Sequence, residues 1–202
     1  MNQEEFWAGD FGTEYIDRNQ DEKLLSSNIH FFSNILARIP NSPESIIELG
    51  ANVGMNIKAI RQLLPKAKFT GVEINKSACE KLRELDCAVH NVPISELKLN
   101  KKFDLVLSKG VLIHINPDDL NDIYKKMYEM SSKWILIAEY YNPVPVVVDY
   151  RGHLDKLFKR DFAGELLSQF KDLELTATGF SYHLDPFPQD DITWFLIRKS
   201  AK

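Results

Sequence analysis

A short segment rich in small residues, Glu48 to Gly54 (ELGANVG), is the part of the chain best suited to bind a nucleotide-like ligand. It follows a β-rich run and precedes a helical pattern, so it joins a strand to a helix. Gly50 and Gly54 allow a tight turn and bring a ligand close to the N–H groups at the start of that helix. Asn52 stands where a positive φ is tolerated, since Asn adopts it more readily than most residues. The segment predicts a ligand site at the carboxyl edge of a sheet.

An acidic residue, Glu73, ends the next predicted strand, 19 positions after Gly54. A carboxylate there can accept hydrogen bonds from both hydroxyls of a ribose. A dinucleotide loop of the form G-x-G-x-x-G needs glycines where this chain has Asn52 and Met55. The E-x-G-x-G-x-G loop of S-adenosylmethionine (SAM) sites departs from the sequence at Asn52 alone. The pattern therefore favours SAM as the cofactor over a nicotinamide dinucleotide.

The elements that must position these residues alternate β-rich runs with amphipathic helical patterns, which is typical of a parallel sheet covered on both faces. Seven strands are expected, at 45–49, 68–73, 87–90, 103–108, 133–139, 173–180 and 192–199. The last two follow each other without a helix, so they must pair antiparallel. The stretch 140–150 is too proline-rich for a central strand, and 151–170 has a helical pattern. We expect an α/β fold with a Rossmann-like, mostly parallel seven-stranded sheet and an antiparallel last strand.

The same reading divides the chain into a helical cap over residues 1–44 and a core over 45–202, within one compact domain. The 202 residues are 44% hydrophobic and 27% charged, as in soluble globular proteins. A net charge of -4 argues against a nucleic-acid partner. Cys79 and Cys87 lack the spacing of metal ligands, so no metal is expected. With neither a signal peptide nor a membrane-length apolar run, we expect a cytoplasmic protein without a membrane partner and leave its oligomeric state open.

The order of elements and the string IIELGANVG resemble class I SAM-dependent methyltransferases from about residue 44 onward. Three further strings resemble the methyltransferases associated with pseudaminic acid biosynthesis: FWAGDFGTEYIDRN from residue 6, KGVLIHINP from 109 and LFKRDFAGEL from 157. The resemblance implies methyl transfer to an oxygen or nitrogen atom of a small molecule. It implies a sugar or nucleotide-sugar intermediate of nonulosonic (pseudaminic) acid or surface glycan biosynthesis as the acceptor. It also implies Glu73 at the ribose, Gly50 and Gly54 beside the methionine portion, and Asn91 or its neighbours at the adenine.

The residues expected to bind the cofactor come from the predicted cap and from the ends of the first four strands. They are Tyr15, Arg18, Glu48, Gly50, Asn52, Gly54, Glu73, Ile74, Asn91, Val92, Lys109 and Gly110. Arg18 can pair with the methionine carboxylate, because a guanidinium matches a carboxylate fork, although a solvated charge is the alternative. Glu48 either reaches the cofactor's amino group through water or caps the helix that follows.

The catalytic candidates are His114, Glu139 and Tyr140. His114 titrates near neutrality and can act as a general base, unless it is a packed structural histidine. The acceptor pocket is expected to be lined by Trp7, Phe11, His114, Tyr140, Tyr141, Tyr150, Arg151 and Tyr182. Aromatic faces attract a sulfonium cation, although packing of the cap on the body explains the aromatic residues of the cap equally well.

Two other functions stay open from the sequence. A SAM-binding regulatory protein would share the cofactor loop but lack an acceptor pocket, and the polar, aromatic segment 139–153 argues against it. A nucleotide-linked oxidoreductase of related fold would need the dinucleotide fingerprint that this chain lacks.

Overall fold

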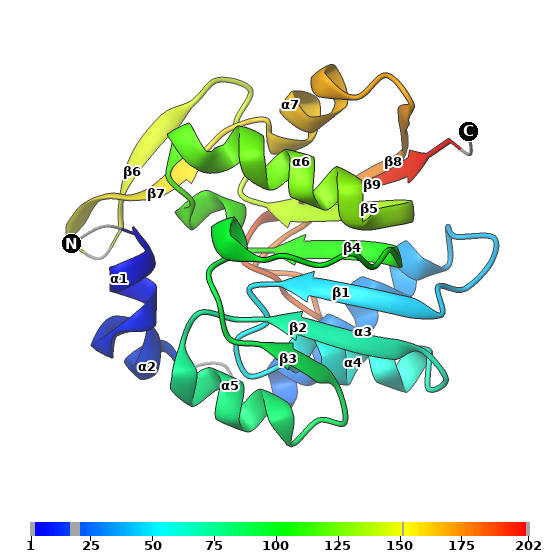
Figure 1. Cartoon of the computed structure of the whole chain (residues 1–202), viewed down its shortest axis with the longest axis horizontal. Helices are drawn as coiled ribbons and strands as arrows, with labels where there is room; N and C mark the ends of the chain where they lie inside the picture. The colour runs from blue at the N-terminus through cyan, green and yellow to red at the C-terminus, as the bar shows by residue number, and fades with distance from the viewer. Residues whose placement is uncertain (1–2, 17–20, 151, 201–202) are drawn as a thin grey trace.

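A computed structural model describes residues 3–16, 21–150 and 152–200. Its centre is a seven-stranded sheet with the order β3-β2-β1-β4-β5-β9-β8 (Figure 1). The strands are β1 (Ser45–Leu49), β2 (Lys68–Val72), β3 (Ala88–His90), β4 (Phe103–Lys109), β5 (Ser131–Glu139), β8 (Leu173–Ser181) and β9 (Ile192–Lys199). The first five run parallel, β9 is antiparallel to β5, and β8 is antiparallel to β9. The predicted sheet is confirmed.

Helices cover both faces of this sheet, because successive side chains of a buried strand point to opposite sides. On one face, α3 (Glu22–Leu36) and α4 (Met55–Leu63) pack on a cluster that includes Leu105 and Leu136. On the other face, α6 (Leu120–Met130) and α7 (Phe162–Gln169) pack on Val106 and Ile135, which are adjacent to Leu105 and Leu136 on the same strands. The remaining helix of the core, α5 (Lys76–Arg83), follows β2. Figure 1 shows α6 on one side of the sheet and α3 and α4 on the other.

The amino-terminal helices have two different positions. Helix α3 is part of the core, since Phe32 and Ile35 are fully buried and the helix packs on α4. Helices α1 (Gln3–Ala8) and α2 (Asp10–Ile16) instead lie at the edge where the parallel strands end (Figure 1). We call α1 and α2 the lid. The lid is therefore smaller than the helical cap expected over residues 1–44.

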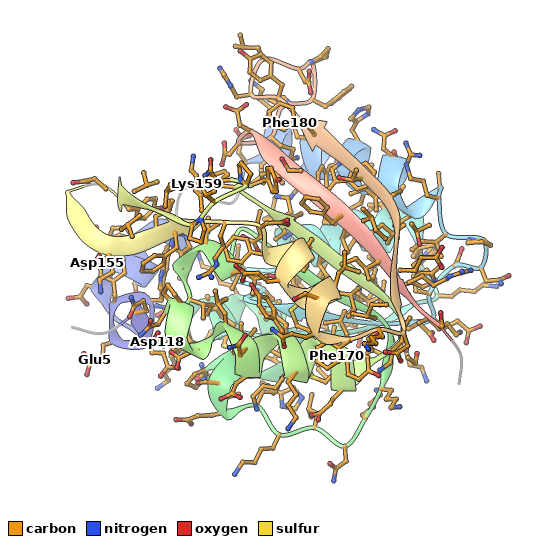
Figure 2. The ribbon with its side chains drawn as sticks, turned by 90° about the horizontal axis from the view of Figure 1, so that it is seen from above. Glu5, Asp118, Asp155, Lys159, Phe170 and Phe180 are labelled. Carbon is orange, nitrogen blue, oxygen red and sulfur yellow. The ribbon has the colours of Figure 1, made fainter. Side chains whose placement is uncertain are left out.

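The sequence predicts a helix over residues 151–170, and this prediction is wrong for the first part of that range. Strands β6 (Val146–Tyr150) and β7 (His153–Lys159) form a separate antiparallel hairpin, and α7 begins only at Phe162. Leu157 and Phe158 have helical spacing from Leu154 in the sequence, but the hairpin packs against residues 112–114, and these tertiary contacts override the local pattern. In Figure 2, Asp155 near the hairpin tip lies at the same end of the molecule as Glu5 of α1.

Three single-turn 3₁₀ helices complete the described fold: η1 (Ile94–Glu96), η2 (Leu112–His114) and η3 (Pro117–Asp119). Among the helices in the described ranges, none is long and apolar enough to cross a bilayer. The same residues contain no cluster of three His, Cys, Asp or Glu side chains arranged to hold a metal ion.

Candidate active site

The loop between β1 and α4 has the backbone geometry that its residues predict. Gly50, Asn52 and Gly54 have φ values of 71°, 48° and 79°, in the left-handed region. The N–H groups of Gly50 and Ala51 both donate to the carbonyl of Val72, which fixes the loop against the end of β2. The positive φ expected for Asn52 is therefore confirmed, and Asn substitutes for the middle glycine of the SAM loop because it tolerates this conformation.

Glu73 connects this loop to the next one. Its carboxylate accepts from the backbone N–H of Asn52 and from that of Asn75, both at 2.7 Å. The side chain is 91% buried, and burial raises the pKa of its carboxyl group. The backbone N–H of Ile74 is a further donor to it. A carboxylate has about four acceptor positions, so capacity remains for a hydroxyl group of a ligand. Glu73 therefore has both the place and the acceptor capacity that ribose binding needs.

A cavity of about 480 Å³ opens beside Glu73 at the carboxyl edge of the sheet. We call it the outer cavity, and its volume lies in the range of small-molecule sites. Its lining comes from the lid, the loop after β1 and the loops after β2, β3 and β4. The lining includes Gln3, Glu4, Trp7, Gly50, Asn52, Glu73, Ile74, Asn75, Val92, Pro93, Ile94, Ser95, Gly110, Val111 and His114.

A second, inner cavity of about 180 Å³ adjoins the first. The two share the residues Gly50, Asn52, Gly110, Val111 and His114. The inner cavity is also lined by polar side chains that come from α3, α4, β4 and the loop before β9, and by two tyrosines. These residues are Asn28, Asn56, Lys109, Gln189, Asp190, Tyr140 and Tyr150. Two ligands, one in each cavity, would therefore lie next to each other at the shared residues.

His114 lies at this junction with its tautomer set by the hairpin. Its Nδ1 is 2.7 Å from the carbonyl oxygen of Lys156 in β7. Because a carbonyl oxygen only accepts, Nδ1 carries the proton and Nε2 keeps its lone pair. No hydrogen bond joins Nε2 to another of the described residues. Burial lowers the pKa of His114 to about 4, against the opposing effect of the Lys156 bond, so the ring is neutral at physiological pH.

Glu139, expected to be a catalytic candidate, has a different position. Its carboxylate accepts from the Ser108 hydroxyl at 2.9 Å and from the N–H groups of Val111, Leu112 and Ile113 at 3.1 to 3.5 Å. It is 98% buried, burial raises its pKa to about 7, and it lies outside the lining of both cavities. With four donors on it, Glu139 holds the η2 turn that carries His114, and we do not retain it as a base.

Glu48 and Lys109 lie under the loop after β1. Glu48 accepts from the Asn56 side chain at 2.6 Å, and its other oxygen is buried with no hydrogen-bond partner among the described residues. Burial raises the pKa of Glu48 to about 8, and the charge of Lys109 opposes that rise. Burial in turn lowers the pKa of Lys109, which lines the inner cavity. The partner seen for Glu48 is thus a side chain of α4 and not the N–H groups at the start of that helix, and its expected contact with the cofactor through water stays a prediction.

Several other predicted residues also lie away from the cavities. Asn91 donates to the carbonyls of Glu73 and Ile74, and the outer cavity is lined by the next residues, Val92 to Ser95. The following lie outside the lining of both cavities: Gly54, Phe11, Tyr141 and Tyr182. Phe11 stacks on Phe6 within the lid, and the other two aromatic side chains are exposed. Arg18, Arg151 and the side chain of Tyr15 lie outside the described residues.

Sequence reasoning named Lys109, Tyr140 and Tyr150 but missed the other polar residues of the inner cavity, which are Asn28, Asn56, Gln189 and Asp190. Gln189 donates to Asn28 at 3.1 Å across 161 positions of sequence, and no local pattern marks either residue. Asn56 was detectable, since it stands in the first turn of the helix after the glycine-containing loop, on the side facing Glu48.

Comparison with known proteins adds a family match over part of the chain and a fold. Residues 47–132 match a family described as a methyltransferase domain, a range that includes both the glycine-containing loop and Glu73. No curated protein matches the sequence. Among solved structures, magnesium protoporphyrin IX methyltransferase from Synechocystis PCC 6803 with bound SAM is 10% identical, with a TM-score of 0.72 over 99% of this chain and 98% of that one.

Two further structures are similar to this chain. The plantazolicin methyltransferase BpumL in complex with S-adenosylhomocysteine (SAH) is 15% identical, with a TM-score of 0.69 over 98% of this chain and 94% of that one. The glycopeptide N-methyltransferase MtfA is 14% identical, with a TM-score of 0.65 over 88% and 90%. At these identities the likeness concerns the fold, and it confirms the predicted Rossmann-like architecture.

Proposed function

We propose that this chain is a SAM-dependent methyltransferase that transfers the methyl group of SAM to an oxygen or nitrogen atom of a polar small molecule. The observation that carries the proposal is the meeting of two cavities at His114, one beside Glu73 and one lined by polar side chains. This arrangement supports a site for a cofactor and an acceptor together, which a protein that only binds SAM does not need.

The outer cavity has the residues to hold the adenosyl group. Glu73 has acceptor capacity left for the ribose hydroxyls, and Val92 to Ser95 surround the space for the adenine. Gly50 and Gly110 let the methionine portion approach the backbone. When bound, SAM supplies a methyl group that the positive charge on sulfur has already activated. The protein therefore contributes alignment and the exclusion of water.

His114 is the general base that a hydroxyl acceptor requires. Its Nε2 accepts the proton that the acceptor oxygen loses, while the Nδ1–H bond to Lys156 keeps the ring in the required tautomer. The low pKa of His114 keeps Nε2 unprotonated at physiological pH. Tyr140 and Tyr150 line the inner cavity beside it and can orient the acceptor with their hydroxyl groups. An amine acceptor that arrives deprotonated needs no base, so His114 would then only position it.

The acceptor that we favour is a sugar or nucleotide-sugar intermediate of nonulosonic (pseudaminic) acid or surface glycan biosynthesis. The polar side chains of the inner cavity match the many hydroxyl groups of a sugar. The three strings that resemble the pseudaminic-acid subgroup also lie together. Trp7 of the first contacts His114 of the second at 4.4 Å between ring centroids, and the third begins one residue after Lys156.

The small-molecule class has independent support. Two of the similar structures are named for their action on plantazolicin and on magnesium protoporphyrin IX, neither of which is a nucleic acid. The net charge of -4 also disfavours a polyanionic substrate.

The test measures SAH release from SAM with a panel of amino- and hydroxy-sugars, both free and nucleotide-linked. We expect release above the acceptor-free background with at least one of them. The variant His114→Gln should lower kcat by about 10²- to 10⁴-fold for a hydroxyl acceptor while SAH still binds. No release with any sugar would contradict the sugar acceptor, and an unchanged kcat on a hydroxyl group would contradict the base.

A further inference from the structure

We propose that Asn75 is a positioning residue that links the lid to the ribose-binding carboxylate, so that cofactor binding and lid closure stabilise each other. The inference rests on the proposed place of the cofactor beside Glu73. It concerns how the site assembles around the cofactor, which the placement of the cofactor alone does not determine.

Asn75 makes hydrogen bonds in three directions. Its backbone N–H donates to Glu73 at 2.7 Å, and its Oδ1 accepts from the N–H of Ala78 at 3.1 Å, which caps the start of α5. Its Nδ2 faces the lid, 3.3 to 3.4 Å from the carbonyl oxygens of Trp7, Ala8 and Gly9 and 3.1 Å from the Thr13 hydroxyl. The side chain is 97% buried, so these contacts form away from water.

The lid provides hydrogen-bond acceptors at the place where the Asn75 amide lies. The last carbonyl groups of a helix have no donor within the helix and form the negative end of its dipole, so a buried N–H donor at the end of α1 satisfies them. Gly12 of α2 permits the approach, because a Cβ there would collide with the Trp7 carbonyl and lie 3.1 Å from Asn75 Nδ2. The α1–α2 turn therefore folds around the Asn75 side chain.

Helix α1 also borders the outer cavity. Trp7 and Glu4 line it, and Glu4 accepts from the Ser95 hydroxyl on the adenine side at 2.6 Å. Gln3 donates to the carbonyl of Asp155 in the hairpin at 3.0 Å. Helix α1 thus spans from the loop after β3 to the hairpin, and we infer that the cofactor enters or leaves when this helix moves.

One chain of hydrogen bonds joins the cofactor site to the lid. It runs from the N–H of Asn52 to Glu73, from Glu73 to the N–H of Asn75, and from the Asn75 amide to the end of α1. Ribose hydroxyls bound to Glu73 would hold its carboxylate in the orientation that the Asn75 N–H needs. Because coupling between two equilibria is reciprocal, a closed lid then also strengthens cofactor binding.

The variant Asn75→Asp separates this role from helix capping. Asp caps a helix as well as Asn does, so α5 keeps its cap, but the lid carbonyls then face a carboxylate oxygen instead of an N–H donor. We expect SAH affinity to fall about tenfold, which corresponds to the loss of one buried hydrogen bond. The SAH-free protein should also melt at a lower temperature, because a carboxylate buried against carbonyl oxygens is unfavourable, so the affinity is measured well below both melting temperatures. The matched control is Asp161→Asn, which exchanges the cap of α7 far from the lid and should leave SAH affinity unchanged.

Amide hydrogen exchange of α1 and α2 distinguishes this positioning role from a merely structural one, because a merely structural role would not change how SAH affects exchange in these helices. In the wild type, SAH should slow exchange across both helices. In Asn75→Asp, saturating SAH should leave that exchange fast. If Asn75→Asp does not fold, Gly12→Ala tests the same contact from the lid side, since a Cβ there would overlap the Trp7 carbonyl and crowd the Asn75 amide while the α5 cap stays intact.

Wild-type SAH affinity together with wild-type protection of α1 in a folded variant would overturn the inference and leave the proposed function standing. A wild type that binds no SAH would overturn both, because the cofactor would then not lie beside Glu73.

Discussion

Glu73 and Glu139 are two buried carboxylates at the carboxyl ends of β2 and β5, and they do different things. Glu73 accepts two short hydrogen bonds from backbone N–H groups and a further one from Ile74, and it lines the outer cavity. Glu139 accepts from three backbone N–H groups and a hydroxyl, and lies outside the lining of both cavities. The number of fixed donors decides the role, because only the carboxylate with unused acceptor positions can bind a ligand. Glu139 serves the site indirectly, through the turn that carries His114.

The largest expected effect is on stability, in Glu139→Ala. The substitution leaves a hydroxyl and three backbone N–H groups without their acceptor in the core. At about 1–3 kcal/mol for each buried unsatisfied group, partly relieved by water, the free energy of unfolding should fall by roughly 3–5 kcal/mol. Urea denaturation measures it. A loss well below 1 kcal/mol would mean that Glu139 does not hold the η2 turn.

Glu73→Ala should act on binding. The variant loses hydrogen bonds from a charged acceptor to the ribose hydroxyls, so SAM or SAH affinity should weaken by roughly 1.5–3 kcal/mol. Calorimetric titration measures it, with Glu73→Gln as the variant that retains one acceptor oxygen and should lose less. Unchanged affinity would contradict the assignment of the outer cavity to the cofactor.

The pH dependence of stability tests the environment of His114, which Glu139 positions. The native pKa is about 4, against about 6.5 in the unfolded chain. Between these values the unfolded chain binds a proton that the native protein does not, so stability is lost as the pH falls from 7 to 5. The wild type should lose up to about 2 kcal/mol more than His114→Gln over this range. Denaturation of both proteins at several pH values between 7 and 5 measures this difference. Equal losses of stability in the two proteins would mean that the His114 ring is exposed to water.

The smallest expected effect is that of Ser108→Ala. Ser108 provides one of the four donors to Glu139, at 2.9 Å, and lies outside the lining of both cavities. Its loss should cost about 0.5–1.5 kcal/mol of unfolding free energy and leave SAH affinity as it is. If Ser108→Ala changed SAH affinity more than stability, Glu139 and its donors would have the ligand-binding role that we assign to Glu73.

The parts of the site predictable from the sequence are those set by neighbouring residues. Gly50, Asn52 and Gly54 have the expected positive φ because that preference belongs to the residue itself. Glu73 was found because its position at a strand end follows from the alternation of strands and helices. By contrast, the helical spacing of residues 154–158 gave a wrong element, since hairpin contacts with η2 outweigh it.

The sequence alone determined a seven-stranded α/β sheet, the glycine-containing loop after its first strand and the acid beside that loop, because periodicity and local backbone preference are short-range properties. Only the tertiary structure decided which buried carboxylate faces a ligand and which nitrogen of His114 carries the proton. It also decided which side chains share the inner cavity. The reason is physical: the donors to Glu139, the acceptor on His114 and the contact between Asn28 and Gln189 come from elements 26 to 161 positions apart. A sequence pattern read within one element carries no information on such pairs.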